Sequence, residues 1–378
     1  MPLGGFMKKA SFHDILLLSF IGILILTMGL SIFLFPKSHF SADENRYLAA
    51  LPSLSFDNLF DGSFSRDFST FCSDRIPARQ KLISLVATSE RLLGKREYNG
   101  IIFGKDGYLI PKGEYSDLTI LNSNLAFIDS LQASATSQSI PLICAVAPRS
   151  IDVNSTRLPS VYSEEYGKIW SLILERRPWI VDLRASFLNS NRSDIWYKTD
   201  HHWTTSGAFL AYCTLCEKLN ISPYGEEFFE ITEVSDDFFG TSSSRVGGIY
   251  ARADSIYLYR YGSDGDFILR VPEKSITQSG FYSLDALDSK DKYSVFLGGN
   301  YGYTEITSNG LGKRERLLVI KDSYANSVIP FLALHFDLTV VDPRYYSEDI
   351  FSLLPNADKI LILFGSDTLA RTVLTSRP

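Results

Sequence analysis

The side chains best suited to covalent chemistry lie in two segments that are far apart in the sequence. The first segment, KTDHHWTTSGAF (198–209), contains Asp200 and His202, and the second, VIKDSYANS (319–327), contains Ser323. In extended backbone, residues two apart face the same side, so Asp200 can orient the His202 ring and stabilise its protonated form. A serine hydroxyl is a weak nucleophile that needs such a base. The residue types therefore indicate acyl transfer through serine, histidine and aspartate.

Both segments also have simpler interpretations. The histidines can stand by chance before a helix whose N-cap lies within 204–206, and Ser323 can serve only as a helix cap. A metal site built from Asp200, His201 and His202 is a further alternative. Adjacent histidines face opposite sides of a strand, however, so His201 would point away from His202, and we expect no bound metal.

The elements around these segments predict an α/β fold with a parallel sheet. Short apolar runs typical of buried parallel strands occur at 141–147, 179–183, 316–320, 338–341 and 359–364, and helical patterns occur at 117–139, 161–176 and 325–335. Ser323 follows one of these strands and precedes a helix. That order places its hydroxyl at the carboxyl edge of the sheet, beside the free N–H groups of a helix N-terminus, where an oxyanion could be stabilised.

Two further stretches have β character. Residues 101–110 (IIFGKDGYLI) predict a hairpin, because Asp106 and Gly107 can adopt the positive φ angles of a tight turn. Residues from about 221 to 315 contain alternating stretches such as SIYLYRY, which predict antiparallel strands inserted into the α/β body. We therefore expect one catalytic α/β domain over 101–378, with a β-rich insertion at about 221–315.

The N-terminal region predicts a membrane attachment. Residues 15–35 are 21 consecutive uncharged residues, and Lys8 and Lys9 precede them. This length suits a membrane-spanning helix, and the basic flank favours a cytoplasmic N-terminus. We expect 1–14 in the cytoplasm, an uncleaved signal-anchor at 15–35 and a membrane-proximal helical segment at 38–100. The remainder would be extracytoplasmic.

Composition excludes two broad classes of protein. An apolar share of 45% is too high for an intrinsically disordered chain. A net charge of −6 excludes a generally basic nucleic-acid binder, so we expect no nucleic acid among its partners.

The two chemical segments together resemble those of the DHHW family of bacterial exported proteins. These are similar to the SGNH-hydrolase-like proteins that acetylate alginate and other extracellular polysaccharides. The resemblance runs from about residue 41 to 365 and also includes ENRYLAALP (44–52), IIFGKDGYLI (101–110), FFGTSSSRVG (238–247), FLGGN (296–300) and VDPRYY (341–346).

The resemblance implies an SGNH-like, flavodoxin-like fold with helices on both faces of the sheet, and a triad of Ser323, His202 and Asp200. Lys321 takes the place of the glycine in the Gly-Asp-Ser block of SGNH hydrolases. Three more residues are candidates for the oxyanion or the substrate: Asn300, Arg344 and Tyr345.

The function implied is O-acetylation of a cell-envelope or secreted polysaccharide through an acyl-serine intermediate. No cofactor is required, but the acyl donor must cross the membrane, so the family implies a multi-span membrane O-acyltransferase as partner. Two alternatives remain open at this point. One is a carbohydrate esterase that uses the same triad with water as acceptor, and the other is a non-catalytic polysaccharide-binding scaffold.

Overall fold

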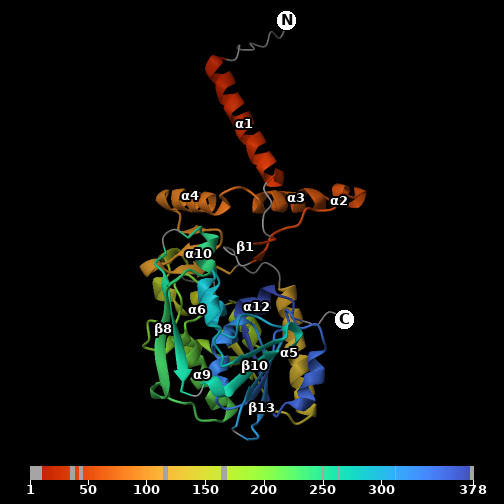
Figure 1. Cartoon of the computed structure of the whole chain (residues 1–378), viewed down its shortest axis with the longest axis vertical. Coiled ribbons are helices and arrows are strands. Elements are labelled where there is room, and N and C mark those ends of the chain that lie inside the picture. The colour runs from red at the N-terminus through yellow and green to blue at the C-terminus, as the bar shows by residue number, and fades with distance from the viewer. Residues whose placement is uncertain are drawn as a thin grey trace. The chain divides into compact units, whose positions relative to one another are not determined.

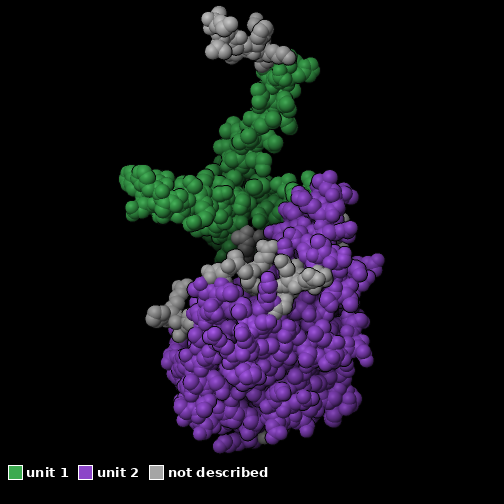
Figure 2. All heavy atoms as spheres, turned by 180° about the vertical axis from the view of Figure 1, so that it is seen from behind, with its two compact units in different colours: residues 1–86 green, residues 87–378 purple. Residues whose placement is uncertain are grey.

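The computed structural model describes most of the chain as two compact units, residues 1–86 and 87–378 (Figure 2). The described residues are 11–34, 39–41, 46–113, 118–162, 168–248, 251–262, 264–310 and 312–374. The two lysines that were used to predict the orientation of the membrane segment lie outside these ranges.

The first unit consists mainly of helices. Helix α1 (Phe12–Leu34) has a mean hydropathy of 2.6 over its most apolar window and is long and apolar enough to cross a membrane. A signal sequence near the N-terminus can meet the same criteria of length and composition. The short strands β1 (Phe40–Ser41) and β2 (Arg46–Tyr47) pair antiparallel, and helices α2 (Phe56–Phe60), α3 (Ser63–Asp74) and α4 (Arg79–Leu92, which continues into the second unit) follow.

The second unit contains an eight-stranded sheet in the order β11-β10-β12-β14-β13-β15-β6-β7. Two of its strands, β10 and β13, are labelled in Figure 1. Five neighbouring strands, from β14 to β7, run parallel, whereas β12, β10 and β11 join them antiparallel. The strands are β6 (Leu142–Ala147), β7 (Val181–Asp182), β10 (Phe267–Val271), β11 (Ile276–Ser279), β12 (Tyr303–Ser308), β13 (Arg316–Lys321), β14 (Asp337–Val341) and β15 (Lys359–Gly365). The predicted α/β fold with a mostly parallel sheet is confirmed.

Apolar side chains cover both faces of this sheet. In β13, Leu317 and Val319 join one hydrophobic cluster, while Leu318 and Ile320 join another, as the period of two in a strand requires. The first cluster includes residues of α9 (Thr205–Leu219) and α11 (Ile329–Ala333), and the second includes residues of α5 (Thr119–Ser137), α7 (Lys168–Leu174) and α12 (Ser366–Arg371). Burial on both faces explains why these strands are continuous apolar runs.

The β-rich region departs in one respect from the sequence prediction. Strands β8 (Phe229–Phe238) and β9 (Asp254–Tyr261) form a separate antiparallel pair, as an insertion would. Strands β10, β11 and β12 instead extend the main sheet beyond β14. The edge of β14 offers unpaired backbone groups, and adding strands there satisfies them.

Two local predictions can be compared with the structure. Strands β4 (Ile101–Phe103) and β5 (Leu109–Pro111) form the predicted hairpin, and its turn residues Asp106 and Gly107 have φ angles of 57° and 83°. The helix predicted at 325–335 is two pieces, the 3-10 helix η9 (Ser323–Ser327) and α11. Pro330 lies in the first turn of α11, where its missing N–H is tolerated, so the helix restarts there.

We expect Leu361→Ala to lower the free energy of unfolding by about 2–5 kcal/mol, because it leaves a cavity in a closely packed core. Leu361 is fully buried in β15, between β13 and β6. Leu284→Ala is the control, since Leu284 is 47% exposed. Urea denaturation of both variants measures the difference, and equal stabilities would contradict this packing.

Candidate active site

Ser323 lies at the carboxyl edge of the sheet, directly beyond β13. After β13 the chain passes through α11, on one face of the sheet, to reach β14. After β14 it passes through η10 (Ile350–Asn356), on the opposite face, and returns past β13 to β15. Such a reversal of direction opens a crevice at the strand ends, where ligands of α/β proteins bind. The sheet order thus places a half-buried serine hydroxyl where a substrate can reach it.

Asp322 holds the turn that presents Ser323. Its carboxylate accepts hydrogen bonds from the backbone N–H of Tyr324 at 3.0 Å and of Gly365 at 2.7 Å. Asp322 thereby caps the short helix η9 and ties it to the end of β15. The cap leaves the serine side chain free for other contacts.

The loop before α9 brings Asp200 and His202 to this serine. Asp200 Oδ1 lies 2.6 Å from His202 Nδ1, and His202 Nε2 lies 2.8 Å from Ser323 Oγ. Asp200 also accepts the backbone N–H of His202 at 3.0 Å. The three residues therefore form a continuous hydrogen-bonded chain, although 121 positions separate the histidine from the serine.

The second carboxylate oxygen of Asp200 is held by residues that the sequence did not single out. Asp200 Oδ2 accepts hydrogen bonds from the backbone N–H of Thr241 at 2.8 Å and from its hydroxyl at 3.0 Å. Thr241 begins the short helix α10 (Thr241–Arg245), directly after Gly240. A Cβ on Gly240 would lie 2.2 Å from Asp200 Oδ2, so only glycine permits this approach. Gly240 and Thr241 both belong to the FFGTSSSRVG segment (238–247). The family resemblance of that segment was the one sequence signal that pointed to them.

Aromatic rings fix the orientation of His202. The Tyr293 ring stacks on the imidazole with centroids 3.9 Å apart and an interplanar angle of 5°. The Tyr293 hydroxyl donates to the Ser323 carbonyl at 3.3 Å. Trp203 Nε1 donates to the Tyr324 carbonyl at 3.1 Å and to Ser327 Oγ at 3.0 Å. These contacts join the histidine loop to the serine turn on both sides of the reactive pair.

The surroundings set the protonation states that acyl transfer needs. Burial alone would raise the pKa of Asp200, but His201, His202 and the hydrogen bonds from His202 and Thr241 hold it well below its usual value. Burial lowers the pKa of His202 to about 4, with His201 adding to the effect and Asp200 opposing it. Near neutral pH the site therefore contains a carboxylate beside a neutral imidazole, which can accept the serine proton.

The alternation of side chains in a strand predicts that His201 points away from His202, and this prediction is wrong. The His201 ring centroid lies 3.8 Å from that of His202, and its Nδ1 is 2.8 Å from Thr241 Oγ1. The backbone at 198–202 is bent, so the period of two does not apply.

Asp200, His201 and His202 could also be read as a metal cluster, because their ligand atoms lie within 4.8 Å of one another. Both ring nitrogens of His202 and both oxygens of Asp200 are engaged in hydrogen bonds, however. This arrangement favours proton transfer over metal coordination.

The backbone N–H of Ser323 is a candidate oxyanion donor, since it makes no hydrogen bond within the described residues. Asn300 lies close by: its Oδ1 accepts hydrogen bonds from Lys321 Nζ at 3.3 Å and from Asn326 Nδ2 at 3.1 Å. Lys321 is buried, which lowers its pKa, and its ammonium also donates to Asn326 Oδ1 at 2.6 Å. The structure thus places Asn300 in a polar network beside the serine turn.

Arg344 and Tyr345 follow β14, and the structure connects them to the site only indirectly. The Arg344 guanidinium donates twice to the buried Asp342, at 2.8 Å and 2.6 Å. Asp342 in turn lies 3.6 Å from Lys321 Nζ. Tyr345 is exposed, beneath the Arg344 guanidinium. Neither residue contacts Ser323 or His202 within the part of the chain that the structure describes.

Comparisons with known proteins identify a matching family and a shared fold. Residues 166–341 match the DHHW protein family. The resemblance seen in the sequence is confirmed. No curated protein matches the chain in sequence.

Solved structures share the fold. A DHHW family protein from Eubacterium siraeum is 19% identical, with a TM-score of 0.61 over 74% of this chain and 94% of that one. PatB1 from Bacillus cereus, solved with a sulfonyl adduct, is also 19% identical, with a TM-score of 0.62 over 74% of this chain and 98% of its own. The DHHW match covers the loop of Asp200 and His202, Gly240, Asn300 and Ser323.

We expect Gly240→Ala to abolish the reaction of Ser323 with a sulfonyl fluoride, because the new methyl group would displace Asp200. Gly262→Ala is the matched control, since a Cβ there meets nothing within 4 Å. Mass spectrometry of the labelled protein gives the extent of reaction. Normal labelling of a folded Gly240→Ala variant would show that the Asp200 position is unimportant.

The pH dependence of the same labelling tests the protonation state of His202. A protonated imidazole cannot accept the serine proton, so the rate must fall as the pH drops through the His202 pKa of about 4. We expect a nearly constant rate from pH 7 to 5 and a decline below that range. A midpoint near 6.5, the ordinary histidine value, would contradict the effect of burial.

Proposed function

We propose that this chain is an extracytoplasmic O-acyltransferase that moves an acetyl group onto a cell-envelope or secreted polysaccharide. The observation that carries the proposal is the hydrogen-bonded chain from Asp200 through His202 to Ser323. The serine stands at a strand end and beside a free backbone N–H group, which are the parts that an acyl-serine mechanism requires.

The first half-reaction acylates the enzyme. His202 Nε2 accepts the proton of Ser323 Oγ as that oxygen attacks the acetyl carbonyl of the donor. Asp200 keeps the proton on Nδ1 and stabilises the imidazolium that forms. The tetrahedral intermediate collapses, the bond to the donor breaks, and the leaving group takes the proton from His202. Acetyl-Ser323 remains.

The second half-reaction transfers the acetyl group to the sugar. A sugar hydroxyl gives its proton to His202 and attacks the ester carbonyl. Collapse of this intermediate breaks the bond to Ser323 Oγ, which recovers its proton from His202. In both steps the Ser323 N–H and the Asn300 side chain would hold the oxyanion, and Arg344 and Tyr345 would contact the substrate beyond it. The sequence of steps needs no cofactor.

The fold comparison supports covalent chemistry of this kind. Sulfonylating reagents react with activated nucleophiles, and the PatB1 structure contains a sulfonyl adduct. The parallel sheet with helices on both faces supports an SGNH-like assignment, with Lys321 standing where SGNH hydrolases have glycine. Acetyl transfer to a polysaccharide is the activity that the DHHW resemblance implies.

Helix α1 supports a location at the membrane. We propose that it remains as a signal-anchor and holds the catalytic unit outside the cytoplasm, near its acyl supply. A multi-span membrane O-acyltransferase would deliver the acetyl group, because activated acetyl donors are made in the cytoplasm.

We expect Ser323→Ala to abolish acylation by an aryl acetate and labelling by a sulfonyl fluoride. Ser327→Ala is the control, because Ser327 lies in the same turn but contacts Trp203 and Tyr293 instead of His202. The mass of the intact protein reports both modifications. Labelling of folded Ser323→Ala at another residue would contradict the proposed nucleophile.

The same assay separates transfer from hydrolysis. Acetylated oligosaccharide formed from an aryl acetate by the wild-type protein, and lost in Ser323→Ala, supports the acyltransferase. Release of acetate from a pre-acetylated polymer, with no transfer, would show an esterase. An absence of any covalent labelling would leave the binding scaffold as the function.

A further inference from the structure

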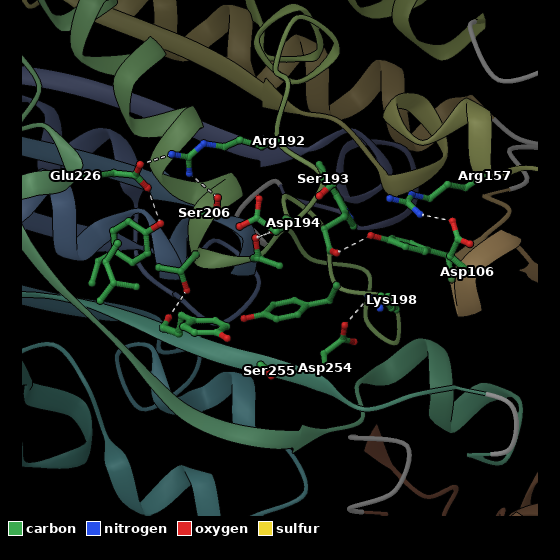
Figure 3. A pocket seen from close by; sticks show the side chains of 18 residues that line it. Asp106, Arg157, Arg192, Ser193, Asp194, Lys198, Ser206, Glu226, Asp254 and Ser255 are labelled. Carbon is green, nitrogen blue, oxygen red and sulfur yellow. Dashed lines mark hydrogen bonds and ion pairs between the residues drawn. The ribbon is translucent and has the colours of Figure 1, made fainter.

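A second hollow in the catalytic unit lies beside the loop that contains Asp200 and His202, and none of the three proposed catalytic residues lines it. Its volume is about 810 Å³, within the usual range of small-molecule sites (Figure 3). Its walls include residues 196–198 and 204–206, the stretches immediately before and after the histidine loop. From β9 they include Asp254, Ser255, Tyr257 and Tyr259.

Aromatic side chains form much of the lining. Trp196 and Tyr197 are buried, whereas Tyr257 is 43% exposed and offers its ring to solvent. The Tyr197 hydroxyl is enclosed and makes no hydrogen bond within the described residues that meets normal geometry. An aromatic face together with enclosed polar groups suits a ligand with an apolar face and hydroxyl edges.

The ionic groups of the lining largely neutralise one another. Arg157 donates to Asp106 at 2.8 Å, and Arg192 contacts both Glu226 and Ser206 (Figure 3). Glu226 also accepts from the Tyr259 hydroxyl at 2.7 Å. Because both arginines already have carboxylate partners, the hollow offers no uncompensated cluster of positive charge for a phosphate or a polyanion.

Two other charged side chains of the lining, those of Asp194 and Lys198, are unpaired among the described residues. The Asp194 carboxylate and the Lys198 ammonium form no ion pair or hydrogen bond among the residues that the structure describes. One accepts hydrogen bonds and the other donates them, which is the combination that holds vicinal hydroxyl groups.

The hollow is tied to the histidine loop through Asp254. This carboxylate accepts the backbone N–H of Lys198 at 2.9 Å and that of Thr199 at 2.8 Å, together with the Thr199 hydroxyl at 2.6 Å. On the other flank, Thr205 Oγ1 donates to the Tyr257 carbonyl. A ligand in the hollow would therefore lie against both ends of the loop that positions the proposed base.

We propose that this hollow is a second saccharide site, which binds a short stretch of neutral oligosaccharide away from Ser323. The ligand class follows from the exposed Tyr257 ring, the compensated charges and the free donor and acceptor. The proposal deepens the proposed function and rests on it for the idea that the ligand is a segment of the polysaccharide acceptor. Binding in the hollow would hold the polymer at the enzyme without taking part in the reaction.

Calorimetry on the full chain in detergent tests the site, with cellohexaose and N-acetylchitohexaose as neutral probes and a hexamer of a uronic acid as the anionic probe. We expect at least one neutral probe to bind, and Tyr257→Ala to weaken that binding by about tenfold through loss of ring contact. Asp194→Asn should weaken it as well. Phe228→Ala is the matched control, since Phe228 is 53% exposed and outside the hollow.

The outcomes separate this proposal from the proposed function. Tyr257→Ala should bind the oligosaccharide about tenfold more weakly while Ser323 still reacts with a sulfonyl fluoride, and Ser323→Ala should bind it as tightly as the wild-type protein. Failure of both neutral probes to bind, tighter binding of the uronic acid hexamer, or unchanged binding by Tyr257→Ala would each overturn the second site. Oligosaccharide binding without any labelling of Ser323 would support the site and contradict the catalytic proposal.

Discussion

The site depends on keeping one buried carboxylate charged. Removing Asp200 from water is costly unless its oxygens are fully hydrogen-bonded, and here the His202 ring, the His202 backbone and Thr241 supply the donors. Each donor comes from a segment whose position the rest of the unit must fix. The charge of Asp200 is thus both the source of the orientation of His202 and the reason for the close approach of Gly240.

The architecture divides the work between a rigid sheet and two attached loops. Strand β13 is buried on both faces and defines where Ser323 stands, whereas His202 arrives on a loop without regular secondary structure. A loop alone would hold the imidazole of His202 only loosely in place. Two aromatic residues compensate. The Tyr293 ring stacks on His202 while its hydroxyl donates to the Ser323 carbonyl, and Trp203, which directly follows His202, packs against Tyr324 and donates to its carbonyl. Precision at the site is therefore achieved by side-chain packing.

Much of this arrangement could be predicted from the sequence, for identifiable reasons. The parallel strands are doubly buried and so appear as uninterrupted apolar runs, and Ser323 follows one of them directly. The pairing of Asp200 with His202 was predicted from their spacing and from the scarcity of histidine in the chain, although a bend at 198–202, not the alternation of a strand, brings the two side chains together.

Other features had no local signal. The stacking of His201 on His202 depends on a bend that alternation rules do not include. The role of Thr241 depends on a contact across 41 positions, and the addition of β10, β11 and β12 to the main sheet depends on which edge is free. The engagement of Arg344 with Asp342 is a pairing of near neighbours, but its consequence, a salt bridge facing Lys321, is tertiary.

The distance along the chain between the histidine and the serine has a consequence for how the protein acquires reactivity. Strands β8 to β13 all lie between the two residues, so the base cannot reach the hydroxyl until this whole stretch has found its place. Before then, Ser323 is an ordinary alcohol with no base beside it. In an unfolded or partly folded chain Ser323 therefore has no base beside it, and the contact between His202 and Ser323 exists only once both segments have reached their places in the folded unit.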